Sequence, residues 1–411
     1  MKENQHMKIL LFCDSHWRDL PTCALVKKKI LEQDNKANVI IVPYLFHDDI
    51  VLNFKPDVVV LSHTNGSRNR NLINLSKRFD AKVVILPTEG RPDRLKDVDW
   101  VSNTSGADLY LSWSENLAKI VETKSNVETK ITGCPRFEIA TKYQSAIKQK
   151  DILAEEYSIN LDKPIVAFAA GYPQSKFNFF NIEFNKQDRN DLGDYLSGRE
   201  RAKQEWERWQ KFQSGIVNTV LEYGNKFEYI FKPHPMDDVL SMQRFCNDYG
   251  IKCVRGDYIF NFVSVADILI AKVACLTHQD AWLMRKPTIH LLADDLSYWD
   301  GATEESLKYG NSIATNLELP EHIQYALFDE EEKDATPYLE KYGFLEENSS
   351  DKVASAILAL GKQNNLKADF VTLQHIINKI DNAAANLIYD NLGHFQKNIM
   401  QKELKMFMEM L

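Results

Sequence analysis

A lysine and a histidine, each followed by a proline, stand at the end of a short apolar segment. Residues 227–231 are followed by Lys232, Pro233, His234 and Pro235. Proline fixes φ and lacks a backbone donor, so strand pairing should stop here, and the residue before each proline is held extended. A cation and an imidazole fixed at a strand end are suited to a phosphate group. A turn that happens to contain a histidine is the alternative interpretation.

Polar segments also follow five apolar runs in the first third of the chain. They are residues 14–21, 63–68, 88–91, 113–115 and 133–137. The carboxyl ends of parallel strands lie on one edge of a sheet, so these side chains should converge. We therefore predict that Asp14, Arg18, Asn65 and Arg136 bind substrate. Capped turns could contain the same residue types.

Glu89 is the best candidate for acid/base chemistry in this half. It follows an apolar run and precedes Gly90, where backbone or ligand can approach closely. A carboxylate at a half-buried wall can be tuned toward neutrality, as a general base requires. A helix cap, or an ion pair with Arg91 or Arg94, is the structural alternative.

Asp19 is a second catalytic candidate, and Arg18 beside it has the fork that matches a carboxylate or phosphate. The structural alternative is that Asp19 caps a helix beginning near Leu20 and Pro21, with Arg18 paired to it.

In the second half, two further strand ends could hold an anion. Gly171 follows an apolar strand, and backbone N–H groups there could cradle a phosphate. Residues 277–282 begin a predicted helix with Thr277 as N-cap and Asp280 in the capping-box position. Because a helix N-terminus attracts anions, we predict that Thr277, His278, Gln279 and Asp280 bind substrate.

Short apolar runs alternating with amphipathic segments must position these residues. The predicted strands are 8–13, 39–42, 57–62, 82–86, 109–112, 128–132, 164–170, 227–231, 251–254, 267–271 and 288–292. The predicted helices include 20–33, 71–79, 200–223 and 277–284. This alternation is typical of parallel, doubly wound α/β sheets.

The 411 residues exceed what one core usually supports, so we predict two domains facing a cleft. We expect residues 1–145 to form a Rossmann-like domain, residues 160–350 a second Rossmann-like domain, and residues 351–411 a helical segment. The last helix packs on the body, forms an oligomer contact, or lies on a membrane surface.

Composition narrows the class of protein. A net charge of −8 argues against binding of nucleic acid through a basic surface. The six cysteines form no CxxC pair, and we find no signal peptide or run long enough to span a bilayer. We expect a cytoplasmic protein without cofactor or metal site, in which any contact with the inner membrane is peripheral.

The motifs together resemble a known group of enzymes. Residues 17–21, 87–90 and 133–137, followed by Lys232–Pro235, 277–282 and 286–289, resemble bacterial surface-carbohydrate biosynthesis proteins of the GT-B glycosyltransferase type. Their order is similar to that in CMP-sugar and CDP-glycerol-type transferases. The resemblance covers residues 8–295, and it implies that domain 1–145 binds the acceptor and domain 160–350 the nucleotide-sugar donor. Residues 272–275 depart from it, because relatives carry small hydroxyl residues there.

The resemblance implies transfer of an acidic sugar from a CMP-activated donor to an oligosaccharide or lipid-linked glycan acceptor. The sugar would be Kdo or a nonulosonic acid such as pseudaminic or legionaminic acid, used for capsule or O-antigen. His234 would meet the nucleotide phosphate, and transfer would need no metal. A nucleotide-sugar epimerase, a CDP-glycerol-type transferase and a non-catalytic polysaccharide assembly protein remain as alternatives.

Overall fold

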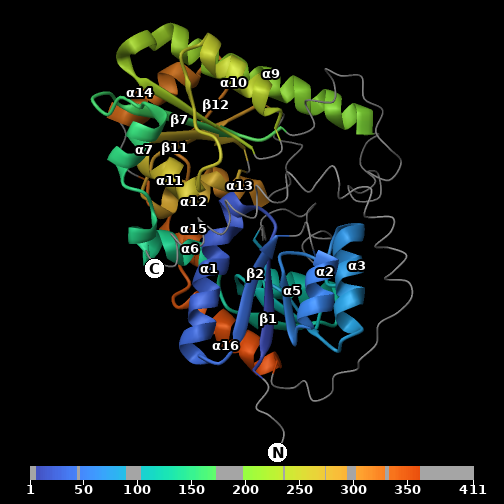
Figure 1. Cartoon of the computed structure of the whole chain (residues 1–411). Coiled ribbons are helices and arrows are strands. Elements are labelled where there is room, and N and C mark those ends of the chain that lie inside the picture. Colours follow the sequence, from blue (N-terminus) through green and yellow to red (C-terminus); the bar gives the residue numbers. More distant parts are fainter. Residues whose placement is uncertain are drawn as a thin grey trace, which may run out of the picture. The chain divides into compact units, whose positions relative to one another are not determined.

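The computed structural model describes residues 6–43, 47–88, 103–172, 198–234, 237–273, 275–293, 302–328 and 333–361. These residues form two compact units. Of the described residues, those from 6 to 88, from 103 to 146 and from 342 to 361 belong to the first unit, and those from 147 to 341 belong to the second. Each unit is built around its own six-stranded, fully parallel sheet (Figure 1).

The first sheet has the strand order β2-β1-β3-β4-β5-β6. Its strands are β1 (Lys8–Cys13), β2 (Asn38–Pro43), β3 (Val58–Leu61), β4 (Lys82–Ile85), β5 (Leu109–Ser112) and β6 (Glu128–Ile131). The inner strands are buried on both faces, which explains why they read as nearly unbroken apolar runs.

Helices cover both faces of the first sheet. One face packs against α1 (His16–Gln33) and α16 (Ser349–Gly361), and the other against α2 (His47–Phe54) and α3 (Gly66–Lys77) (Figure 1). Two further helices, α5 (Glu115–Lys124) and α6 (Pro135–Thr141), follow β5 and β6.

After the second unit, the chain returns to the first unit at Tyr342. Trp113, Phe137 and Phe344 form an aromatic trio with ring centroids 4.4 to 6.0 Å apart. Gly343 has φ +76°, and a β-carbon there would come 2.0 Å from the Trp113 carbonyl oxygen. The return therefore needs glycine at this position, and it delivers the apolar face of α16 to the first sheet.

The second sheet has the order β12-β11-β10-β7-β8-β9. Its strands are β7 (Ile165–Ala170), β8 (Glu228–Pro233), β9 (Lys252–Cys253), β10 (Ile268–Lys272), β11 (Thr288–Leu291) and β12 (Ser312–Ala314). As predicted, β8 ends at the first proline of the Lys-Pro-His-Pro segment.

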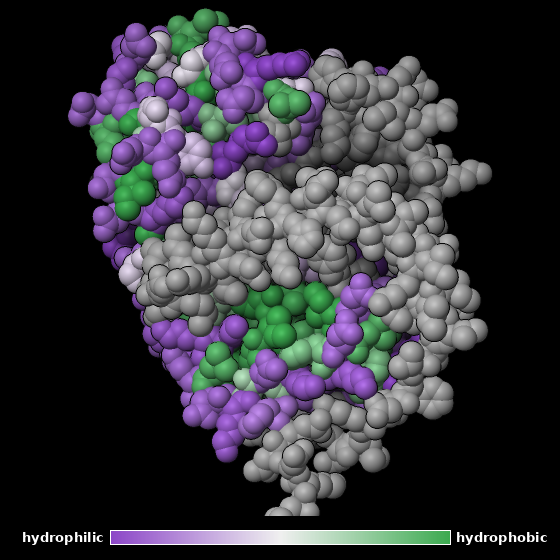
Figure 2. All heavy atoms as spheres, viewed as in Figure 1, coloured by the Kyte–Doolittle hydropathy of each residue, from purple (hydrophilic) through white to green (hydrophobic). Residues whose placement is uncertain are grey.

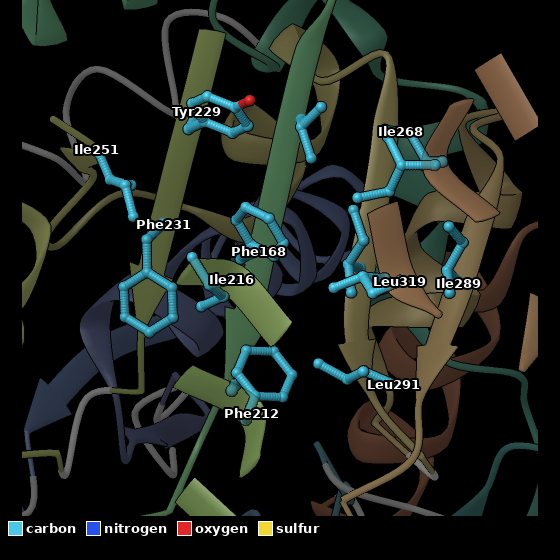
Figure 3. Packing of buried hydrophobic residues seen from close by; sticks show 14 of the residues in the cluster. Phe168, Phe212, Ile216, Tyr229, Phe231, Ile251, Ile268, Ile289, Leu291 and Leu319 are labelled. Carbon is cyan, nitrogen blue, oxygen red and sulfur yellow. The ribbon is translucent and has the colours of Figure 1, made fainter. Parts of the chain in front are cut away.

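Large aromatic and aliphatic side chains fill the core on one face of the second sheet (Figure 3). They come from the strands and from α9 (Gly198–Tyr223), α10 (Val239–Asp248) and α14 (Leu319–Phe328). The opposite face packs against α7 (Lys150–Tyr157), α11 (Ile259–Val265) and α12 (Thr277–Leu283). The remaining short helices among the described residues are α13 (Ala302–Leu307), α15 (Thr336–Lys341) and the 3-10 helices Gln144–Ala146 and Gly224–Lys226.

Candidate functional site

The central strands of the second sheet bring polar groups together at their carboxyl ends. Strands β10, β7 and β8 are neighbours, and Ala170 pairs with Pro233 in the last step of the β7–β8 register. Gly171 and His234 follow directly. A β-carbon at Gly171 would come 2.8 Å from the Cβ, Cγ and Cδ2 atoms of His234. Two predicted site residues are therefore in contact.

Asp237 ties these two strand ends together. Its Oδ1 accepts the backbone N–H of Tyr172 at 3.1 Å, and its Oδ2 accepts the backbone N–H of His234 at 2.8 Å. Burial raises the pKa of Asp237 to about 6, although the two N–H donors and the charge of Lys272 act in the opposite direction. The carboxyl group thus fixes the backbone that carries the histidine.

Lys272, the last residue of β10, supplies a cation at the same edge. Its ammonium group donates to the carbonyl oxygen of Gly171 and lies 4.8 Å from the centroid of the Tyr172 ring. That ring is buried against Trp209 and Phe212 of α9, at centroid distances of 6.0 and 6.1 Å. An amine held over an aromatic face beside a half-buried imidazole can bind an anionic group.

The side chain of Lys232 does not follow the expectation from the sequence, which placed it beside His234 as a ligand of the phosphate. Its ammonium group donates to the backbone carbonyl of Asp257, and burial lowers its pKa to about 8. The Asp257 carboxylate in turn accepts from Asn261 at 2.6 Å and from Lys148 at 2.9 Å. Lys232 thus joins a network beside β9, and its role as a phosphate ligand stays a prediction.

The segment after β10 differs from its predicted capping box. Helix α12 begins with Thr277 already inside it and Leu276 as the N-cap, without a side-chain cap bond. The Thr277 hydroxyl lies 3.1 Å from the Cys275 sulfur instead. A capping residue is extended and precedes the helix, whereas Thr277 lies within the helix and Leu276 before it already has helical backbone angles.

The next three predicted binding residues are inside the second unit. His278, Gln279 and Asp280 are each at most 2% exposed. The His278 Nε2 atom lies 3.2 Å from the backbone oxygen of Lys272, so this histidine contacts the strand end that presents the lysine. Direct contact of these three side chains with a ligand stays a prediction.

At the corresponding edge of the first sheet, Asp19 and Arg18 form a tight pair. The Arg18 Nε atom donates to Asp19 Oδ1 at 2.6 Å and its Nη2 atom to Oδ2 at 3.0 Å. Asp19 also accepts the backbone N–H of Ser15 at 2.9 Å and is only 1% exposed. Helix α1 begins at His16, earlier than predicted, so Asp19 lies within its first turns and satisfies a donor at its start.

Further side chains at this edge are linked across strands. Asp14 accepts from Arg18 at 3.3 Å and from Arg68 at 3.2 Å. The Asn65 Oδ1 atom accepts from Asn103 at 2.7 Å. Arg136 is 4% exposed, with its guanidinium 5.5 Å from the Phe137 ring centroid. Glu89 and Gly90 lie outside the described residues, as does Pro235.

Comparisons with known proteins identify the fold. No family model and no curated protein matches the sequence. Among solved structures, the wall teichoic acid polymerase TagF has a TM-score of 0.58 at 11% identity, covering 87% of this chain and 89% of that one. The chain has the GT-B fold.

Two further solved structures show the same fold. A Listeria monocytogenes protein assigned as a UDP-N-acetylglucosamine 2-epimerase has a TM-score of 0.53 at 12% identity, with coverage of 90% of this chain and 100% of that one. MnaA of S. aureus in complex with UDP has a TM-score of 0.52 at 12% identity, with coverage of 86% and 95%. At these identities the likeness concerns the fold.

Two residues at the second-sheet edge, Lys272 and Asp237, were not among the predicted site residues. A signal for each was present in the sequence. Lys272 is a cation at the end of a predicted strand, and Asp237 lies three residues after His234, within reach of its backbone. Among the described helices, none combines the length and hydrophobicity that crossing a bilayer requires.

Proposed function

We propose that this protein is a glycosyltransferase that uses a nucleotide-activated sugar and binds the donor phosphate at the edge formed by β10, β7 and β8. The observation that carries the proposal is the contact of His234 with Gly171, fixed by Asp237 and accompanied by the ammonium group of Lys272. In open parallel sheets, ligands bind at the carboxyl ends of the strands.

The donor that we propose is a CMP-activated acidic sugar of the Kdo or nonulosonate kind, and the acceptor is a surface glycan or its lipid-linked precursor. A CMP-sugar carries one phosphate. One ammonium group and one imidazole donor can together stabilise the negative charge that develops on that phosphate as the sugar departs. Glu89 in the first unit is the proposed base for the acceptor hydroxyl.

Epimerisation of a nucleotide sugar is the second candidate, because one of the structures with this fold carries a 2-epimerase name and another was solved with UDP. The polymerase TagF has also been solved with CDPG, which favours including a CDP-linked donor among the candidates. The proposed phosphate-binding role of the β10-β7-β8 edge is common to all these reactions.

One assay separates these reactions. The purified chain is incubated with CMP-, UDP- and CDP-linked donors, with and without a glycan acceptor preparation, and the released nucleotide and sugar products are measured. Acceptor-dependent CMP release is the expected result, and excess EDTA should leave it unchanged. Isomerisation of a UDP-sugar without acceptor would establish epimerisation, and no turnover of any donor would contradict an enzymatic role.

A further inference from the structure

Among the described strands, β2 is the last strand on one side of the first sheet. β2 pairs with β1 in parallel register from Asn38 opposite Lys8 to Pro43 opposite Cys13, and no described strand lies on its other side. It is six residues long and contains no charged residue. Figure 2 shows hydrophobic surface where Figure 1 draws this edge of the first unit.

The other sheet edges among the described strands differ in ways that block pairing. β6 places Glu128 and Lys130 on its exposed surface, and β9 and β12 are only two and three residues long. Proteins commonly protect edge strands by such charges or by shortness. β2 has neither protection, so its edge is suited to receive another strand.

The hydrogen-bonding direction along β2 is fixed by its pairing with β1. The Asn38 N–H donates to the Met7 carbonyl at 2.8 Å, so Asn38, Ile40 and Val42 direct their backbone groups toward β1. Backbone direction alternates along a strand, and the N–H and C=O groups of Val39 and Ile41 therefore point to the open side. Pro43 falls on the same side, where the missing N–H costs no bond to β1.

We propose that the β2 edge is a dimer interface, where β2 of a second copy of this chain pairs antiparallel about a two-fold axis centred on Ile40. In this register Val39 faces Ile41 of the second copy, and each of these pairs exchanges two backbone hydrogen bonds. All outward groups of Val39 and Ile41 are then satisfied in both copies. Centring the axis on Ile41 would instead set Val39 against Pro43, which has no N–H to give.

Side chains and charges agree with this arrangement. Ile40 is 36% exposed on the same face of the sheet as the buried Val42, and the two-fold axis places it against its own copy. An antiparallel pairing also brings Lys36, which precedes β2, toward the acidic first turn of α2 in the other copy, where Asp48 and Asp49 lie. A closed two-fold contact of this kind uses one self-complementary surface.

The mass of the full chain in solution tests the interface. Sedimentation should give twice the 47.4 kDa of one chain, and Ile40→Lys should give the single mass with an unchanged circular dichroism spectrum. In the matched control, Ile313→Lys, the changed residue is equally 36% exposed on the edge strand β12, and the dimer should persist. A monomeric wild type, or an Ile40→Lys dimer, overturns the proposal.

Cross-linking tests the register independently of stability. Directly opposed residues in a non-hydrogen-bonded antiparallel pair have Cα atoms about 4.5 Å apart, within the range that a disulfide accepts. Under mild oxidation Ile40→Cys should yield a reducible dimer on a denaturing gel. Asn38→Cys should yield none beyond wild type, because its copy lies four positions away along the strand. The reverse pattern would contradict the register.

Discussion

The side chain of His234 lies directly against the α-carbon of Gly171, so closely that an added β-carbon would come 2.8 Å from three of its atoms. The position of the histidine side chain therefore requires that residue 171 has no β-carbon. The contact arises because β7 and β8 are in register to their last residues and both chains leave the sheet at the same level.

Gly171→Ala should displace the imidazole while the fold is kept. Misplacing a reacting group by about 1 Å can cost on the order of 10²-fold in rate, and we expect a loss of that order in kcat for sugar transfer. Gly224→Ala serves as the control, since φ there is +50° and no atom lies within 4 Å. It should lower the unfolding temperature and leave kcat unchanged. Equal kcat values for the two variants would refute the role of the contact.

The two lysines of the second-sheet edge should behave differently. Lys272→Met removes the ammonium group beside Gly171 and should weaken donor binding about tenfold or more, since charged hydrogen bonds contribute about 1.5–3 kcal/mol. Lys232→Met removes the contact with Asp257 and should lower stability more than donor affinity. Calorimetric titration with CMP and thermal unfolding measure both effects. If Lys232→Met alone weakens binding, the phosphate ligand is Lys232.

The Asp237 carboxyl group should give stability a particular pH dependence. Its pKa rises from 3.8 to about 6 on folding because it is buried, so the folded chain holds an extra proton between these values. The free energy of unfolding contributed by this group therefore falls as the pH rises from about 4 to about 6, by about 1–3 kcal/mol.

Asp237→Asn does not titrate and isolates this effect. Urea unfolding of both proteins at pH 4.5 and pH 6.5 gives the difference in stability between wild type and variant at each pH. The free energy of unfolding of the wild type, relative to that of the variant, should fall as the pH rises. Parallel changes in the two proteins would show that Asp237 does not titrate in this range.

Glu89→Gln tests the acceptor side of the proposed reaction. The amide keeps the shape and hydrogen bonding of the side chain but cannot accept the proton of an acceptor hydroxyl. Donor affinity should stay near the wild-type value while transfer is lost. A variant that binds CMP normally and transfers sugar at the native rate would shift the base to Asp14 or Asp19.

Most strands of the two sheets could be predicted from the sequence, because burial on both faces makes a strand a nearly unbroken apolar run. Segment 109–112, for example, is predicted and observed with the same limits. β12 was missed because Ser312, Ile313 and Ala314 are too few and too polar in context to stand out. The packing of α16 on the first sheet was also missed, since nothing local in residues 349–361 identifies a partner more than 200 residues away.

The candidate site, like the fold, could be predicted from the sequence only in part. The neighbourhood of His234 and Gly171 follows from the rule that strand ends converge. The direction of each lysine does not, because it depends on which backbone carbonyl lies within reach after folding. Lys232 finds that of Asp257, whereas Lys272 finds that of Gly171.

The kcat of His234→Ala for CMP release in the presence of acceptor is the most direct test of the proposed function. Removing one donor that stabilises developing charge typically costs on the order of 10²–10³ in rate, and we expect a loss of that size with an unchanged unfolding transition. His322→Ala on α14, in the same unit, should retain full activity. A His234→Ala enzyme with near-wild-type kcat would contradict the account.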